Sequence, residues 1–197
     1  ETAVGNYLVT TVEGELEIKK DEKVLVITSA TNSWTYDGAL HKDETYTVTY
    51  GGTEVEADST GKVFTLANGD EITINATAAG VTNVSDNAEK NNTYTYTVKN
   101  GTTDTSGNYQ TITANVGTLT IEPKAVTITA ASNSWTYDGK AHTEGGFEAS
   151  DLESGDTHTF AVVMTEESTI TNVGTQPNVI ATVDGVAVET GEETAVG

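Results

Sequence analysis

The sequence contains no cysteine and no arginine, and it has only two prolines. Without cysteine, disulfides, thiol catalysis and cysteine-ligated metal sites are all excluded. Without arginine, the side chain that binds phosphate in the bidentate manner is missing. Long apolar runs are also missing, so we expect no insertion into a membrane. The first residues read as the middle of a domain and not as a signal peptide, so we expect targeting signals elsewhere in a longer protein.

Positive charge is scarce, because nine lysines face 30 acidic residues and the net charge is −21. Such a surface repels nucleic-acid phosphates and anionic lipids, so we expect no nucleic-acid partner. It favours solubility and mutual repulsion between neighbouring chains. The apolar fraction is 36% without glycine, which leaves enough side chains for a hydrophobic core. A chain of 197 residues therefore has room for one large domain or two small ones.

An internal repeat organises the chain. The heptapeptide Asn-Ser-Trp-Thr-Tyr-Asp-Gly at residues 32–38 recurs unchanged at residues 133–139. A second phrase, Asn-Tyr followed by Gly-x-Leu-x-Ile, occurs at residues 108–121 and again at residues 6–18. This second phrase does not recur after the second heptapeptide. We therefore predict three parts: residues 1–22 are the closing hairpin of a preceding repeat, residues 23–123 are a complete first repeat, and residues 124–197 are a second repeat that lacks its closing strands.

Alternation of side chains with a period of two predicts strands. Residues 45–50 and 93–98 place tyrosine or valine on one face and threonine on the other, and residues 157–162 follow the same period. Turn signals of the Asn-Gly, Asp-Gly and Gly-Gly type separate the strands, and Val183–Val186 predicts the clearest hairpin. No segment predicts a long helix, and residues 85–91 suit one short turn. The sequence predicts an all-β chain of two tandem small β-sandwich or β-grasp-like repeat domains with little or no helix.

The order of these motifs resembles the YDG/MBG-type tandem repeats of bacterial cell-surface adhesins. In those repeats a strand leads into Tyr-Asp-Gly, followed by Gly-Asp, Asn-Tyr and a closing Gly-x-Leu-x-Ile strand. The first repeat has this order at Tyr36-Asp37-Gly38, Gly69-Asp70, Asn108-Tyr109 and Gly117–Ile121, and the second has Tyr137-Asp138-Gly139 and Gly155-Asp156. The first repeat departs from the pattern by its length between Glu54 and Lys62, which predicts an extra hairpin.

The resemblance implies a secreted, repetitive protein on the outside of a bacterium, often anchored to the cell wall. It implies no catalytic residue. The absence of cysteine is compatible with the surface of a Gram-positive bacterium. We therefore expect an extracellular location and neighbouring repeats of the same protein as partners.

The candidate ligand-binding residues are two tryptophans. Trp34 and Trp135 occupy the same position of the repeated heptapeptide. Tryptophan stacks on sugar faces in carbohydrate-binding modules, but it also anchors cores and domain junctions. Period two places Trp34 on the face of Tyr36, and Trp135 on the face of Tyr137. A structural role is therefore the alternative to ligand binding.

Three acidic residues in one loop of the second repeat are weak candidates for a metal site. Asp151, Glu153 and Asp156 offer the oxygen ligands that Ca²⁺ prefers. Their spacing does not match an EF-hand loop, and a solvated turn is the alternative. We predict no cofactor, and Ca²⁺ is the one ion that this loop would suit.

No catalytic constellation is recognisable in the sequence. The histidines are His41, His142 and His158, and the first two occupy equivalent positions beside a turn in the two repeats. None lies in a catalytic phrase, so we predict that the protein is not an enzyme. Lys23 and Lys124 open the two repeats and are the candidates for an intramolecular isopeptide bond to an asparagine or aspartate.

Three functions follow from these observations, and the sequence favours the first. The chain is a structural repeat region, or stalk, of a secreted bacterial surface protein of the adhesin type, in which each repeat adds length. Alternatively, it is an adhesive module that binds host glycan, mucin or matrix protein. In a third reading it is a head-to-tail filament subunit. A repeat without closing strands exposes a sheet edge, which residues 1–22 of another copy would complete.

Overall fold

A computed structural model describes residues 6–150, 152 and 158–196 of the chain. Over these residues it has fifteen strands and two 3-10 turns, which confirms the all-β fold class. The chain divides into two compact units. Unit 1 comprises the chain up to Ala30, Glu44–Ala78 and Asn92–Gly117. Unit 2 comprises Thr31–Asp43, Ala79–Asn91 and the chain from Thr118 onward.

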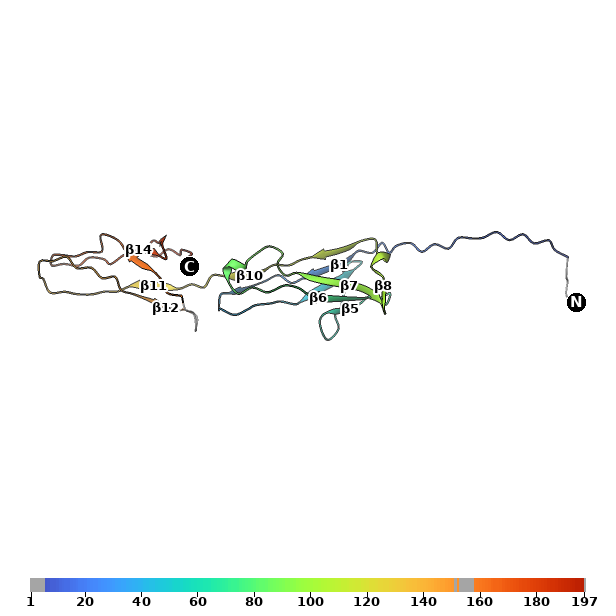
Figure 1. Ribbon diagram of the computed structural model, residues 1–197, viewed down its shortest axis with the longest axis horizontal. Helices are drawn as coiled ribbons and strands as arrows, with labels where there is room; N and C mark the ends of the chain where they lie inside the picture. Colours follow the sequence, from blue (N-terminus) through green and yellow to red (C-terminus); the bar gives the residue numbers. More distant parts are fainter. Residues whose placement is uncertain (1–5, 151, 153–157, 197) are drawn as a thin grey trace. The chain divides into compact units, whose positions relative to one another are not determined.

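Unit 1 contains two four-stranded sheets (Figure 1). The first has the order β4-β3-β1-β9, with β1 (Leu25–Ser29), β3 (Tyr46–Tyr50), β4 (Thr53–Val55) and β9 (Ile112–Asn115). The second has the order β5-β6-β7-β8, with β5 (Val63–Thr65), β6 (Glu71–Ala76), β7 (Tyr94–Asn100) and β8 (Thr103–Asp104). Neighbouring strands are antiparallel except β1 and β9, which are parallel. The end of the first repeat therefore returns beside its own first strand.

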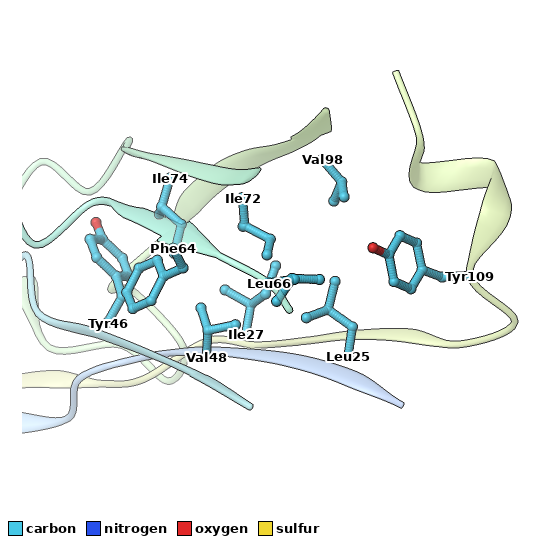
Figure 2. Close-up of a cluster of buried hydrophobic side chains, with 10 residues drawn as sticks. All are labelled: Leu25, Ile27, Tyr46, Val48, Phe64, Leu66, Ile72, Ile74, Val98 and Tyr109. Atoms are coloured by element: carbon cyan, nitrogen blue, oxygen red, sulfur yellow. The ribbon is translucent and has the colours of Figure 1, made fainter. Parts of the chain in front are cut away.

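Side chains from both sheets of unit 1 form one core (Figure 2). In β3, Tyr46 and Val48 are buried while Thr47 between them is exposed, as the period of two predicts. The same alternation buries Val98 of β7. Removing these apolar side chains from water is the main stabilising term of the unit. The buried members of the core are Leu25, Ile27, Tyr46, Val48, Phe64, Leu66, Ile72, Ile74, Val98 and Tyr109.

A buried carboxylate lies at one end of this core. Asp70 is only 6% exposed. The Tyr109 hydroxyl donates a hydrogen bond to its Oδ2 at 2.6 Å, and Asn100 Nδ2 donates to its Oδ1 at 3.1 Å. Asn68 Nδ2 in turn donates to the Tyr109 hydroxyl at 2.9 Å. The Gly-Asp and Asn-Tyr motifs, distant in sequence, therefore form one polar network that satisfies the buried charge.

We expect loss of the Tyr109 hydroxyl to weaken this network and to make the free energy of unfolding less dependent on pH. Burial raises the pKa of Asp70, but the hydrogen bonds from Tyr109 and Asn100 outweigh burial and hold it below the ordinary 3.8. The ionised network therefore adds stability above the unfolded-state pKa, and that stability is lost as pH falls through the lower folded-state pKa. Tyr109→Phe is expected to cost about 1–3 kcal/mol at neutral pH, because buried acceptors lose a donor.

Urea unfolding at a series of pH values tests this expectation. The free energy of unfolding should fall less steeply with acid in Tyr109→Phe than in the unchanged protein. Tyr7→Phe is the matched control, because Tyr7 is 84% exposed. Equal acid dependence of Tyr109→Phe and the unchanged protein would show that the network adds no pH-linked stability.

Unit 2 contains three smaller sheets. The first pairs β2 (Asn32–Thr35) with β10 (Leu119–Glu122) in parallel. The second pairs β11 (Thr127–Ala130) with β12 (Phe147–Ser150), and the third has the order β13-β14-β15, with β13 (Val162–Met164), β14 (Ile180–Val183) and β15 (Val186–Ala187). These latter pairs are antiparallel. Of the described residues, no helix has the length and apolar character needed to cross a membrane.

The turns follow the local sequence signals. Val183 pairs with Val186 across Asp184 and Gly185, whose φ angles are 50° and 79°, so the predicted hairpin is confirmed. The longer segment of the first repeat also turns, since Ala57 bridges Phe64. The 3-10 turns are η1 (Val84–Asp86) and η2 (Ser106–Asn108).

Residues 6–20, within the segment predicted as a closing hairpin, form no strand. They run as an extended single chain (Figure 1), and every one of them is exposed. A two-stranded ribbon is marginal in water unless a further strand or layer covers it. Among the described residues, the first backbone pairing is the bridge between Asp21 and Tyr109. The exposed apolar side chains of this segment are Tyr7, Leu8, Val9, Val12, Leu16 and Ile18.

Candidate functional site

The repeated heptapeptide of the first repeat ends in a turn that is held by its own side chains. Asp37 Oδ1 accepts a hydrogen bond from the backbone N–H of Ala39 at 2.8 Å and lies 2.9 Å from His41 Nε2. These two contacts hold the pKa of Asp37 below its ordinary value. Gly38 has a φ of 73°, which glycine adopts at little cost. The His41 ring stacks on Trp34, with centroids 4.9 Å apart and planes 19° apart.

The second repeat builds the same turn. Asp138 Oδ1 accepts from the N–H of Lys140 at 2.9 Å and lies 2.9 Å from His142 Nε2. Gly139 has a φ of 74°. His142 stacks on Trp135 with centroids again 4.9 Å apart, at an angle of 15°. The sequence indicated that the two histidines are equivalent, but it did not indicate that each stacks on a tryptophan.

The neighbours of the two tryptophans differ. Trp34 is half-buried and packs on a small core of Val81, Leu119 and Ile121. Strand β10 supplies two of these residues, and its Ile121 lies opposite Trp34 in the parallel pairing with β2. Trp34 is thus part of a packed face, whereas Trp135 is 41% exposed. The candidate ligand-binding residue with an accessible ring is therefore Trp135.

Two asparagines bind the second edge of β10. Asn91 accepts the N–H of Leu119 at 2.6 Å through Oδ1 and donates to the carbonyl of Leu119 at 2.8 Å through Nδ2. Asn87 does the same to Ile121 at 2.7 and 2.9 Å. Each side-chain amide therefore takes the place of a neighbouring strand. This role could not be predicted from the sequence, since asparagine at residues 85–91 is equally typical of a turn.

The corresponding place in the second repeat is an open groove with a volume of about 510 Å³. Residues 131–137 line one wall, residues 168–178 line the other, and residues 142–144 complete it. The walls are joined as in the first repeat, because His142 bridges Ile170 just as His41 bridges Val81. Residues 133–136, which are equivalent to β2, form no strand. The groove therefore has the same two walls as the place that holds β10 in the first repeat, but no strand lies between them.

One end of this groove carries a buried polar atom without a partner. Asn178 Nδ2 donates to the carbonyls of Ala131 and Glu144 at 2.9 and 3.0 Å. The equivalent Asn92 Nδ2 donates to the carbonyl of Ala30 at 2.8 Å in the first repeat. Asn178 Oδ1 is buried and has no hydrogen-bond partner. Since buried acceptors are normally satisfied, this atom marks a place for an additional donor.

The other predicted site residues lie apart from the groove or outside the described residues. His158 Nε2 is 2.9 Å from Asp184 Oδ2, and Lys23 Nζ lies 5.0 Å from the centre of the Tyr50 ring. Across the described part of the chain, no group of three or more histidine, aspartate or glutamate side chains could hold a metal ion. The metal candidates Asp151, Glu153 and Asp156 lie outside the described residues.

Comparisons with known proteins give no relative for this chain. No protein-family model, curated protein or solved structure matches it. The structure itself shows an all-β fold in which the same turn, with a histidine stacked on a tryptophan, occurs in both repeats. The resemblance to YDG/MBG-type repeats depends on the sequence motifs alone.

Proposed function

We propose that the chain is a structural repeat region, or stalk, of a secreted bacterial surface protein of the adhesin type. The observation that carries the proposal is the turn shared by the two repeats. In each copy the aspartate of the motif lies 2.9 Å from the histidine that follows the motif, and that histidine stacks on the tryptophan of the motif with ring centroids 4.9 Å apart. Residues common to both copies thus support the fold, as expected where each repeat adds length.

The charge of the chain supports the same proposal. A net charge of −21 keeps neighbouring stalks apart and soluble. The motif order supports an extracellular location on a bacterial surface, through its resemblance to adhesin repeats. We propose no enzymatic role, because the histidine that follows each heptapeptide, His41 or His142, stacks on a tryptophan and so has a structural role in the turn.

An adhesive module is the second candidate, and one observation favours it. Trp135 and Tyr137 are 41% and 66% exposed, and both line the open groove. Aromatic rings at the wall of a groove suit stacking on the apolar face of a sugar. A host glycan is therefore the ligand class that this groove would suit, with mucin or matrix protein as its carrier.

A surface-display experiment tests the stalk. A peptide tag is anchored to a bacterial cell wall through no copy, one copy or two copies of the chain, and an antibody reports its accessibility. We expect accessibility to rise with each copy and to exceed that given by a Gly/Ser linker of equal length, because folded units exclude their own volume and a flexible chain coils back. Accessibility that does not depend on copy number would contradict the proposal.

A binding screen separates the two candidates. The purified chain is tested against glycans, mucins and matrix proteins at physiological salt, with folding checked by circular dichroism. The stalk predicts no saturable binding. An adhesive module predicts a saturable ligand whose affinity falls about tenfold or more in Trp135→Ala. Val163→Ala is the matched control, because Val163 is 57% exposed and does not line the groove.

A further inference from the structure

The groove of the second repeat and the exposed segment at residues 6–20 fit each other as a site and its strand. We propose that the groove binds residues 7–19 of a second copy of this chain as an added β-strand, so that copies join head to tail. This inference goes beyond the stalk and does not depend on it. Addition of a strand to an open edge is a general mode of recognition, in which the backbone supplies affinity and alternate side chains supply specificity.

The occupant is identified by the first repeat, where the equivalent site is filled. There the filling strand has the pattern Gly117, Leu119 and Ile121, and the latter two side chains are buried to 1% exposure. Residues 6–18 carry the same phrase with Gly14, Leu16 and Ile18. Leu16 and Ile18 are fully exposed in the chain as it stands. Removing two such apolar side chains from water would favour the association.

The register follows from the equivalence of the repeats. In the first repeat Leu119 pairs with Asn32 and Ile121 with Trp34. The added strand would then place Leu16 opposite Asn133 and Ile18 opposite Trp135. The half of the strand before the glycine would lie along β11, as β9 lies along β1. β1 has neighbours on both edges, whereas among the described strands β11 pairs only with β12, so one edge of β11 is open for it.

Glycine is required where the strand crosses the groove. A Cβ atom on Gly117 would lie 2.0 Å from the carbonyl oxygen of Ala30, and Ala131 is the equivalent residue in the second repeat. The added strand brings Gly14 to this place. In the first repeat the N–H of Gly117 donates to Ser29 Oγ, but Ala130 stands in the place of Ser29 in the second repeat. The N–H of Gly14 would therefore be free to donate to Asn178 Oδ1, which lacks a donor. The phrase thus matches the groove in its glycine, its apolar residues and its backbone.

The contact is large enough for a stable complex. An extended chain exposes roughly 1.45 Å² per dalton, so the thirteen residues 7–19 expose on the order of 2,000 Å². Burying half of that area exceeds the approximately 800 Å² that each partner contributes to a standard interface. The chains carry equal charge of −21 and repel each other, so added salt should strengthen the association.

Three versions of the 197-residue chain are compared by light scattering after size exclusion, over a range of concentrations. Gly14→Val disables the strand but not the fold, because a Cβ atom at Gly14 meets nothing within 4 Å in the free chain. Trp135→Glu disables the groove. We expect the unchanged chain to form dimers and larger species that grow with concentration and salt. Each variant alone should stay at the monomer mass of 20.6 kDa.

A mixture of the two variants gives the decisive result. The Trp135→Glu chain retains a working strand and the Gly14→Val chain a working groove, so only one contact can form. We expect the mixture to stop at a dimer, with association of each single variant weakened about a hundredfold or more. Valine adds apolar surface, so non-specific association would increase in Gly14→Val and not disappear.

Three results would overturn the proposal. The unchanged chain could remain monomeric at every concentration and salt. Gly14→Val could associate as the unchanged chain does, which would assign the contact to another surface. Residues 6–20 could be protected from proteolysis in a monomer, which would seat the strand in its own chain. If Trp135→Glu does not fold, a synthetic peptide of residues 6–20 replaces it. That peptide should dissolve the oligomers, and its Gly14→Val version should not.

Discussion

Gly117→Ala is expected to remove at least about 4 kcal/mol from the stability of the protein, a large part of the 5–15 kcal/mol that a domain has. The alanine Cβ would lie 2.0 Å from the carbonyl oxygen of Ala30, 2.5 Å from its carbon and 2.6 Å from the carbonyl oxygen of Ser29. All three are backbone atoms, so no side-chain rotation relieves the overlap. The chain between β9 and β10 would have to move away from the strand that it crosses.

The same move would break hydrogen bonds that hold the crossing. The Gly117 N–H donates to Ser29 Oγ at 2.9 Å, and its carbonyl accepts from the N–H of Asn92 at 3.1 Å. Ser29 Oγ also donates to the Asn92 carbonyl at 2.7 Å. These groups are buried, and unpaired buried groups cost about 1–3 kcal/mol each. The steric and polar losses therefore add in the same direction.

Urea unfolding followed by circular dichroism measures the effect, and Gly107→Ala is the matched control. A Cβ atom at Gly107 meets nothing within 4 Å, and its backbone is not left-handed. Alanine there reduces the freedom of the unfolded chain, so the control should change stability by less than about 1 kcal/mol. A Gly117→Ala protein as stable as the control would show that the crossing is looser than the structure has it.

The local part of the fold could be predicted from the sequence. Alternation at residues 45–50 correctly placed Tyr46 and Val48 on the buried face, because side chains of a strand point to opposite faces in turn. Asp184 and Gly185 correctly marked a hairpin, because both tolerate positive φ. These signals act between neighbours in the chain, so a single sequence contains them.

The pairing of distant segments could not be predicted in the same way. Nothing in residues 112–122 indicates that β9 and β10 return in parallel beside β1 and β2. The contact of Asp70 with Tyr109 was also invisible, since the motifs were known only by their order. Histidine beside a turn suggested a surface position, and the stacking on tryptophan depends on the return of the chain after Gly38. Such contacts depend on the order and direction of the strands, which cannot be predicted from the local signals of a single sequence.

The place that holds β10 and its counterpart, the groove of the second repeat, were predictable in part. The heptapeptide drew attention to Trp34 and Trp135, and Trp135 lines the groove of the second repeat. The asparagine amides that bind β10 were missed, because the same residues serve turns. At the equivalent place the second repeat has Gln176 and Pro177 before Asn178. Proline has no side-chain amide, so a strand added there would be held less firmly than β10.

Asn91→Ala should therefore show how much an amide contributes to holding a strand, and we expect a loss of about 2–4 kcal/mol. Leu119 is 1% exposed, and its N–H and carbonyl bind Asn91 at 2.6 and 2.8 Å. The substitution leaves both groups without a partner, at about 1–3 kcal/mol each, with some recovery through water. Asn172→Ala is the matched control, because Asn172 is exposed.

Asn91→Asp separates the amide donor from the acceptor. The aspartate keeps an oxygen for the Leu119 N–H, but its second oxygen faces the Leu119 carbonyl, and two acceptors repel each other. We expect it to be less stable than Asn91→Ala at neutral pH and to regain part of the difference below about pH 4, where a protonated carboxyl can donate. Urea unfolding and hydrogen exchange at the Leu119 amide measure both effects. Unchanged exchange protection in Asn91→Ala would mean that β2 alone holds β10, and that an amide wall is not needed to seat a strand.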